Sequence, residues 1–271
     1  AVLRAVQPLL RYKLARRGAV EPGYLEAVEE RFGVYTQPRG EGYVWVHAVS
    51  LGEARAAAIL IAQLRELLPN LRLLLTHGTA TGRAEGQKIL REGDVQVWQP
   101  WDTADAVRKF LQHFRPKMGV LIETEVWPNL VAQCRAAQLP LLLVNARMSA
   151  QSLAKALGAW SLARAAYGGL TAVYAQAEDD AQRLRQLGAK VQGVLGNLKF
   201  DANPNPEQLS TARGWRAICI CPRIARRERS FQPSSCARAR AGPRAAHRRG
   251  SRRSSRRRVT WRWRSIIAAG E

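Results

Sequence analysis

Three acidic residues in this sequence stand shortly after apolar runs, the spacing expected of a ligand site where strands end. Glu53 follows the run 43–47, and Glu123 and Glu125 follow the run 118–122. A carboxylate in the first turn of a helix is expected to stay ionised and can accept a proton, so Glu53 could act as a general base. In an extended backbone, Glu123 and Glu125 would point to the same side.

These acids also have structural explanations. Ser50 and Glu53 are spaced as in a capping box, in which two side chains satisfy free amides at a helix start. Glu123 or Glu125 could instead pair with a neighbouring Arg. No His or third acid follows these two at ligand spacing, so a metal site is only weakly indicated.

Other polar residues also follow apolar runs. Gly52 would let a substrate approach the backbone, and the hydroxyls of Thr79 and Thr81 could hold a phosphate at a helix start. The Lys of a nucleotide-binding P-loop is missing there, so these residues are no evidence for ATP. The remaining polar positions include Asn145, Arg147, Asn197 and Lys199.

The elements that must position these residues follow from hydrophobic periodicity. Short apolar runs predict seven buried strands, at 43–47, 71–76, 95–99, 118–122, 141–145, 172–175 and 191–195. Segments with helical spacing, such as 57–68 and 107–114, separate them. This alternation predicts an α/β fold with a doubly wound parallel sheet, which binds ligands beyond the carboxyl ends of its strands. The polar residues are therefore expected on one rim of one domain, assigned to 41–205.

The charge of this 271-residue chain lies mainly at its end. Residues 213–271 hold 18 Arg, two acids and no Lys, and contribute +16 of the net +22. With Trp261 and Trp263, this segment could bind nucleic acid through phosphate contacts and stacking. Natural basic arms usually mix Lys with Arg, however, and the abrupt loss of Leu and Lys is typical of GC-rich DNA read in a shifted frame. We therefore interpret 206–271 as an irregular Arg-rich tail, out of frame or disordered, and expect no specific nucleic-acid partner.

Residues 1–40 mix apolar side chains with basic ones, as in an amphipathic helix at an anionic membrane surface. The basic residues before the first apolar run include Arg4, Arg11, Lys13, Arg16 and Arg17. A surface helix packed on its own domain is the alternative interpretation. No apolar stretch is long enough to span a bilayer, and a few residues with a membrane anchor could precede Ala1.

Five ordered motifs, at 29–33, 50–53, 123–129, 145–149 and 196–201, together resemble one family. The chain resembles the 3-deoxy-D-manno-octulosonic acid (Kdo) transferases, which attach Kdo to the lipid A precursor in lipopolysaccharide synthesis. The resemblance covers about residues 1–212. It implies the N-terminal half of a GT-B glycosyltransferase, in which two Rossmann-like domains face each other, the first binding the acceptor and the second CMP-Kdo.

The resemblance also implies roles for the rim. Glu53 would remove a proton from the acceptor hydroxyl, and Glu123 would help to form the acceptor site. The reaction would invert the anomeric centre without a bound metal or cofactor. Arg147 and Lys199 would contact the lipid A phosphates. The other candidate acceptor-binding residues are Ser50, Gly52, Thr79, Thr81, Glu125 and Asn197.

The chain departs from the family after Asp201, because the Gly-rich and acidic donor motifs do not follow. We therefore expect this chain to lack a CMP-Kdo site and to be inactive by itself. Its expected location is the cytoplasmic face of the bacterial inner membrane. A basic nucleic-acid-binding protein and a GT-B transferase using another sugar nucleotide are the alternatives. Deleting 213–271 would test the first, and binding of another sugar nucleotide to an intact homologue would favour the second.

Overall fold

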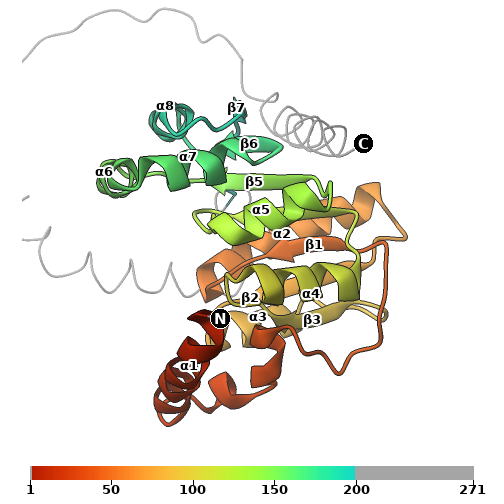
Figure 1. The fold of residues 1–271 in the computed structure, drawn as a ribbon. Helices are drawn as coiled ribbons and strands as arrows, with labels where there is room; N and C mark the ends of the chain where they lie inside the picture. The colour runs from red at the N-terminus through yellow and green to blue at the C-terminus, as the bar shows by residue number, and fades with distance from the viewer. Residues whose placement is uncertain (1, 199–271) are drawn as a thin grey trace, which may run out of the picture. The chain divides into compact units, whose positions relative to one another are not determined.

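Seven strands form a parallel sheet at the centre of the structure, in the order β3-β2-β1-β4-β5-β6-β7 (Figure 1). The computed structural model describes residues 2–198, with side chains described from residue 7 onward. The strands are β1 (Val44–His47), β2 (Leu73–His77), β3 (Val95–Trp98), β4 (Met118–Ile122), β5 (Leu141–Ala146), β6 (Ala172–Ala175) and β7 (Val191–Val194).

All seven predicted strands are present, and the predicted doubly wound α/β fold is confirmed. Their ends differ from the prediction by at most two residues, as at the start of β2. Every residue of β1, β2 and β4 is buried. Helices cover both faces of such a sheet, so its strands appear in the sequence as continuous apolar runs.

Helices follow the first six strands, as the periodicity predicts, and one α-helix precedes β1. They are α1 (Val2–Gly18), α2 (Leu51–Leu67), α3 (Ala80–Gln87), α4 (Ala104–Phe114), α5 (Pro128–Ala136), α6 (Ala150–Gly158), α7 (Trp160–Gly168) and α8 (Glu178–Gln186). Two short 3-10 helices, η1 (Pro22–Leu25) and η2 (Val28–Phe32), precede β1. The predicted helical segments 57–68 and 107–114 correspond to α2 and α4.

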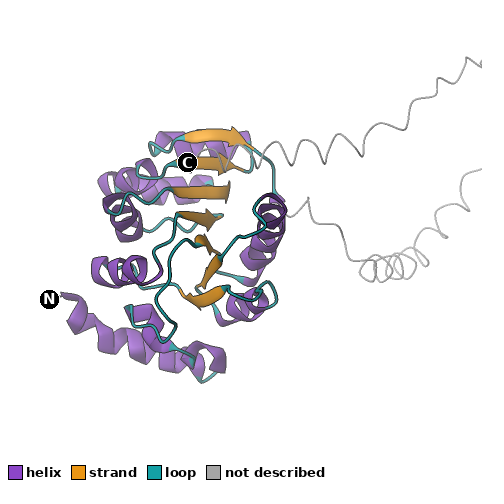
Figure 2. Ribbon diagram, turned by 90° about the vertical axis from the view of Figure 1, so that its right-hand side faces the viewer, coloured by secondary structure: helices purple, strands orange, loops and turns teal. Residues whose placement is uncertain are grey.

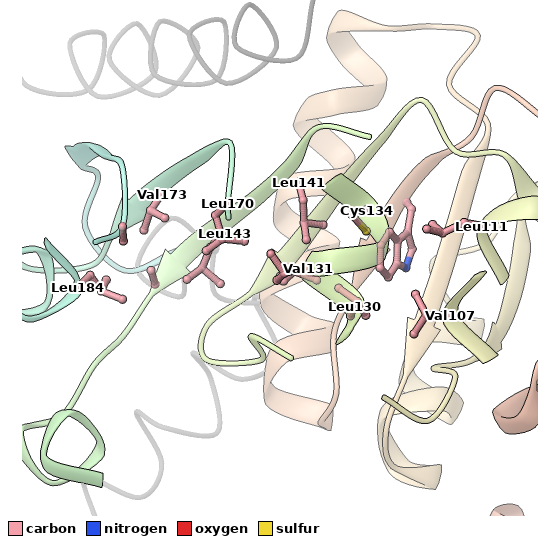
Figure 3. Close-up of a cluster of buried hydrophobic side chains, with 14 of the residues drawn as sticks. Val107, Leu111, Leu130, Val131, Cys134, Leu141, Leu143, Leu170, Val173 and Leu184 are labelled. Carbon is pink, nitrogen blue, oxygen red and sulfur yellow. The ribbon is translucent and has the colours of Figure 1, made fainter. Parts of the chain in front are cut away.

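Two apolar cores hold the helices against the sheet, which lies between layers of helices in Figure 2. One core joins Trp45 and Leu143 of the sheet to helices α4, α5 and α8, and Figure 3 shows part of it. The other joins Val46 and Val120 to Leu60 and neighbouring residues of α2. Burying a side chain the size of Leu contributes about 1.5 to 3 kcal/mol, so these cores make the strand ends a rigid base for a site.

The strand order places a topological switch point between β1 and β4. From β1 the chain moves outward through β2 to β3, and β4 then returns to the other side of β1. The loops after β1 and β4 therefore diverge at the carboxyl edge of the sheet. In open α/β sheets, ligands bind in the crevice formed at this point.

The N-terminal segment packs on the domain through a small third core. Leu14 of α1 and Tyr24 of η1 are buried there with Ala80 and Trp98. The alternative interpretation of residues 1–40, a helix packed on its own domain, therefore describes part of this segment. Its other side chains, described below, leave an exposed basic and apolar surface.

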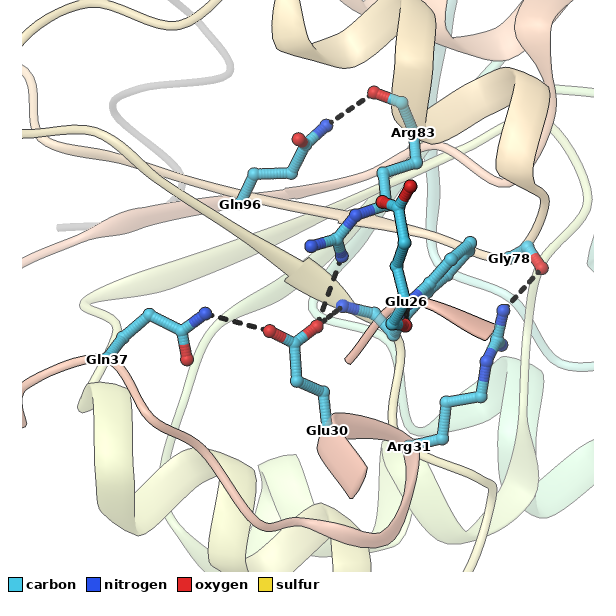
Figure 4. Close-up of polar contacts among 8 residues, drawn as sticks. Glu26, Glu30, Arg31, Gln37, Gly78, Arg83 and Gln96 are labelled. Atoms are coloured by element: carbon cyan, nitrogen blue, oxygen red, sulfur yellow. Dashed lines mark hydrogen bonds and ion pairs between the residues drawn. The ribbon is translucent and has the colours of Figure 1, made fainter. Parts of the chain in front are cut away.

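Polar contacts from η2 strengthen this packing (Figure 4). The Glu30 carboxylate accepts hydrogen bonds from the Trp98 backbone N–H at 2.7 Å and from Arg83 at 3.1 Å. The Arg31 guanidinium lies 3.9 Å from the ring centroid of Trp98 and donates a hydrogen bond to the Gly78 carbonyl at 3.2 Å. The motif at 29–33 thus joins the N-terminal segment to β3 and to the loop after β2.

Lys199 and the predicted tail 206–271 lie outside the described residues. Within residues 2–198, no helix is both long enough and apolar enough to cross a membrane.

Candidate active site

Glu53 lies in the first turn of α2, where its carboxylate is held by two donors. Oε2 accepts a hydrogen bond from the Val49 N–H at 2.8 Å, and Oε1 accepts one from the Ser50 hydroxyl at 3.1 Å. The Ser50 oxygen in turn accepts from the Glu53 N–H at 3.3 Å. The predicted capping arrangement is present, except that the carboxylate bonds to the residue before the N-cap. These capping hydrogen bonds hold the Glu53 side chain in place. They are compatible with Glu53 also accepting a proton.

The surroundings of Glu53 raise its proton affinity. Burial raises the pKa of Glu53 from 4.5 to about 7, although the Val49 N–H and the Ser50 hydroxyl act in the opposite direction. The negative charges of Glu125 and Glu123 raise this pKa further. The expectation that the helix start keeps Glu53 ionised is therefore wrong near neutral pH, where both forms are populated. A pKa near the working pH suits a group that takes up and releases a proton.

Glu123 and Glu125 follow β4 in a turn. Glu123 has φ of 65°, in the left-handed region, and Thr124 accepts a backbone hydrogen bond from Val126 at 2.9 Å. The assumption of an extended backbone, from which we predicted that both acids point to the same side, is therefore wrong. A non-glycine residue in this conformation stores backbone strain, which is found disproportionately at functional sites.

A neutral side chain lies next to each of these two carboxylates. The Trp127 indole N–H donates to Glu125 Oε2 at 2.9 Å, and Asn145 Nδ2 lies 3.5 Å from Glu123 Oε1. Burial raises the pKa of Glu125. No salt bridge to Glu125 occurs within residues 2–198. The alternative interpretation, in which Glu125 pairs with an Arg, is therefore not supported by the described residues.

The loop after β2 braces the loop that carries Glu53. The Val49 carbonyl accepts hydrogen bonds from the Thr79 N–H at 3.0 Å and from the Thr79 hydroxyl at 2.8 Å. The Thr79 oxygen also accepts from the Gly82 N–H at 3.1 Å, as the N-cap of α3. A Cβ at Gly82 would lie 2.6 Å from the Val49 oxygen, so the close approach of the two loops requires glycine. The Thr79 hydroxyl is thus engaged within the protein, whereas Thr81 is exposed.

The remaining predicted acceptor residues lie around this rim. Arg147 is exposed directly after β5, and its backbone N–H donates to the Glu123 carbonyl at 3.2 Å. Gly52 is half-buried in the first turn of α2, and Asn197 is half-buried after β7. The rim therefore brings together side chains from the loops after β1, β2, β4, β5 and β7.

Two residues that support the site were absent from the predicted set. Asp102, after β3, caps α5 by accepting hydrogen bonds from the backbone of Leu130 at 2.7 Å and of Asn129 at 3.2 Å. Asn145, buried in β5, contacts both Glu123 and the backbone of Leu198. The sequence signal for Asn145 is a polar residue at the end of an apolar run. Its partners are distant in sequence, so the pattern could not reveal them.

The rim offers carboxyl, hydroxyl and amide groups to a ligand, and the pKa of Glu53, about 7, suits a group that exchanges a proton near neutral pH. Among residues 2–198, no three His, Cys, Asp or Glu side chains are grouped in a way that could hold a metal ion.

Comparison with known proteins identifies the family. Residues 26–202 match the family model described as 3-deoxy-D-manno-octulosonic-acid transferase (kdotransferase). The chain belongs to this family. Its domain is therefore a Kdo transferase domain with a Rossmann-like fold, and the resemblance seen in the motifs is confirmed.

Several Kdo transferases are similar to the chain. It is 46% identical over 187 residues to the 3-deoxy-D-manno-octulosonic acid transferase of Bordetella pertussis, covering 67% of this chain and 43% of that protein. It is 28% identical over 223 residues to the transferase of the same name from Haemophilus influenzae, covering 80% and 52%. A probable mitochondrial transferase of Arabidopsis thaliana is 34% identical over 153 residues, covering 56% and 34%. The chain thus spans about half the length of the first two relatives.

Proposed function

We propose that this domain is the acceptor-binding part of a glycosyltransferase that transfers Kdo from CMP-Kdo to the lipid A precursor. The observation that carries this proposal is Glu53, a buried carboxyl group with a pKa of about 7 at the switch point of the sheet. The family supports a Kdo transferase, and the sugar hydroxyl of an acceptor is the group that needs a base.

In the proposed reaction, Glu53 takes the proton of the acceptor hydroxyl as the hydroxyl oxygen attacks the anomeric carbon of Kdo. CMP leaves from the opposite face, so the anomeric centre is inverted. No metal is needed to generate the nucleophile. Glu123 orients the acceptor, and Arg147 and Lys199 contact its phosphates, since guanidinium and ammonium groups pair well with phosphate. We expect CMP-Kdo to bind to a second, C-terminal domain.

The test is a transfer assay with a chimera that joins residues 1–202 to the remaining C-terminal part of the Bordetella pertussis relative. We expect the chimera to attach Kdo from CMP-Kdo to the lipid A precursor. A folded chimera that releases CMP only with a different acceptor would contradict the proposal. The nucleic-acid alternative depends on the tail, which lies outside the described residues, and nothing in the described domain favours it.

We further propose that the N-terminal surface contacts the anionic cytoplasmic face of the bacterial inner membrane. Leu9, Tyr12 and Val20 are exposed apolar residues that line a groove together with the cationic residues Lys13, Arg16 and Arg17. Apolar side chains interleaved with basic ones favour binding at an anionic lipid surface.

Vesicle binding should depend on this surface. A fragment comprising residues 1–210, which omits most of the tail charge, should sediment at low salt with vesicles containing phosphatidylglycerol. The triple variant Lys13→Gln, Arg16→Gln, Arg17→Gln should lose most of this binding, because each basic side chain contributes about 1 kcal/mol near such a surface. A control with Arg91, Arg108 and Arg115 changed to Gln removes equal charge elsewhere. Equal losses in both variants would count against a specific surface.

A further inference from the structure

Asn145 is a buried polar residue at the carboxyl end of β5 whose backbone has an unusual conformation. Only 3% of its surface is exposed, and its φ is 56°, in the left-handed region. The pairing of β5 with β6 shifts register between Leu143 and Ala146, so Asn145 lies in an irregular part of the strand. Asn adopts this conformation more readily than most residues, but Gly would adopt it at lower cost. The backbone conformation alone therefore does not account for Asn at this position, and its side chain must contribute.

The hydrogen bonds of Asn145 fix which way its amide faces. Oδ1 accepts a hydrogen bond from the Leu198 N–H at 3.1 Å. Because an N–H can bond only to the oxygen end of the amide, the Nδ2 end must face the other way. That end lies 3.5 Å from Glu123 Oε1, at the outer limit of a hydrogen bond.

The backbone around Asn145 also holds Glu123. The Glu123 N–H donates to the Val144 carbonyl at 3.0 Å, and the Glu123 carbonyl accepts from the Arg147 N–H at 3.2 Å. Gln176, directly after β6, donates to the Asn145 carbonyl at 3.0 Å. Asn145 is thus anchored from β6 and by the segment after β7, while its neighbours and its amide surround Glu123.

We propose that Asn145 is a positioning residue that orients the Glu123 carboxylate toward the acceptor and couples it to the chain segment leaving β7. The amide NH₂ group faces the carboxylate, and the Leu198 bond keeps that amide from turning over. The proposal rests on the proposed function, because it assigns Glu123 to the acceptor site. Glu123 lies close enough to Glu53 for its charge to act on that carboxyl group, and the backbone N–H of Arg147 donates to the Glu123 carbonyl.

The variant Asn145→Asp separates this role from simple tethering. Asp keeps the left-handed backbone and the oxygen that accepts from Leu198, but it places a carboxylate where the NH₂ faced Glu123. Two carboxylates that share a site cannot both ionise easily, so the pair should titrate at higher pH. The matched control is Asn70→Asp, the same substitution at an exposed residue in the turn between α2 and β2.

The experiment follows the side-chain carboxyl carbons of Glu123 and Glu53 by NMR during a pH titration of the whole 271-residue chain. We expect Asn145→Asp to move the Glu123 midpoint upward by about one pH unit or more, and Asn70→Asp to leave it within about 0.2. If Asn145→Asp does not fold, Asn145→Gly suits the backbone and removes the NH₂ group, and a smaller upward shift is expected. A Glu123 midpoint that moves no further in the folded position-145 variant than in Asn70→Asp would overturn the proposal.

A second readout separates this proposal from the proposed function. In the transfer chimera, Asn145→Asp should lower kcat and move the acid side of the rate profile to higher pH, whereas Asn70→Asp should do neither. If the NMR shift occurs but the unsubstituted chimera transfers no Kdo, the positioning of Glu123 stands and the proposed function fails. If transfer occurs and Asn145→Asp shows neither the NMR shift nor the altered rate profile, the positioning role fails alone.

Discussion

Glu53→Gln is expected to lower kcat for Kdo transfer by the chimera by about a hundredfold to ten-thousandfold, the range typical of general-base catalysis. The Gln side-chain amide cannot take up the acceptor proton near neutral pH, as the Glu53 carboxylate could. The loss should appear mainly in kcat, with a smaller change in KM, if acceptor binding is intact. Initial rates of transfer at saturating CMP-Kdo and varied acceptor concentration measure both parameters.

The fold should tolerate this change. The Gln amide oxygen can accept the hydrogen bond from Val49 or Ser50, so the start of α2 is preserved. Glu66→Gln, at an exposed position of the same helix, is the matched control and should keep near-normal turnover. If Glu53→Gln kept more than about a tenth of the unsubstituted rate, Glu53 would be a capping residue and not the base.

The pH dependence of transfer should show the ionisation of Glu53. Because its pKa is about 7, kcat/KM should fall about tenfold for each pH unit below that value and level off above it. The residual rate of Glu53→Gln should lack this dependence. A rate that stays constant from about pH 5 to 8 would exclude a base with this pKa.

The same ionisation links stability to pH with a definite sign. The folded pKa of Glu53, about 7, lies above the ordinary value of 4.5, so the folded state favours the protonated form. The preference of the folded state for protonated Glu53 stabilises the fold fully below pH 4.5. This stabilisation is lost as the pH rises through 7. Relative to the unsubstituted chain, Glu53→Gln should therefore gain stability between about pH 5 and 8, by at most about 3 kcal/mol. Urea unfolding at several pH values measures this, and a pH-independent difference would contradict it.

The strands and the location of the rim were predictable from sequence because they depend on local pattern. Strands buried on both faces, such as β4, are continuous apolar runs, and parallel strands bring the residues that follow them to one edge. Glu53, Glu123 and Arg147 were therefore expected on that edge, and the structure places them there. Sequence motifs added the family, which periodicity alone could not supply.

The geometry of the rim depended on contacts that local pattern does not contain. The left-handed turn at Glu123 occurs without a glycine, so nothing in the sequence indicated that the backbone was not extended. The bond of Thr79 to Val49, 30 residues away, could not be foreseen from the pattern. Asp102 and Asn145 were missed as supporting residues for the same reason, since their partners lie 28 and 53 residues away. The raised pKa of Glu53 likewise arises from burial in the folded domain.

The proposed acceptor site can be tested by mapping where the acceptor headgroup binds on this chain. A deacylated, bisphosphorylated glucosamine disaccharide would be titrated into the ¹⁵N-labelled chain, with CMP titrated separately. We predict that the disaccharide shifts the amide signals of Gly52, Thr81, Glu125 and Arg147, and that CMP leaves them unchanged. Signals that do not move with the disaccharide, or that move equally with CMP, would contradict an acceptor site on this rim.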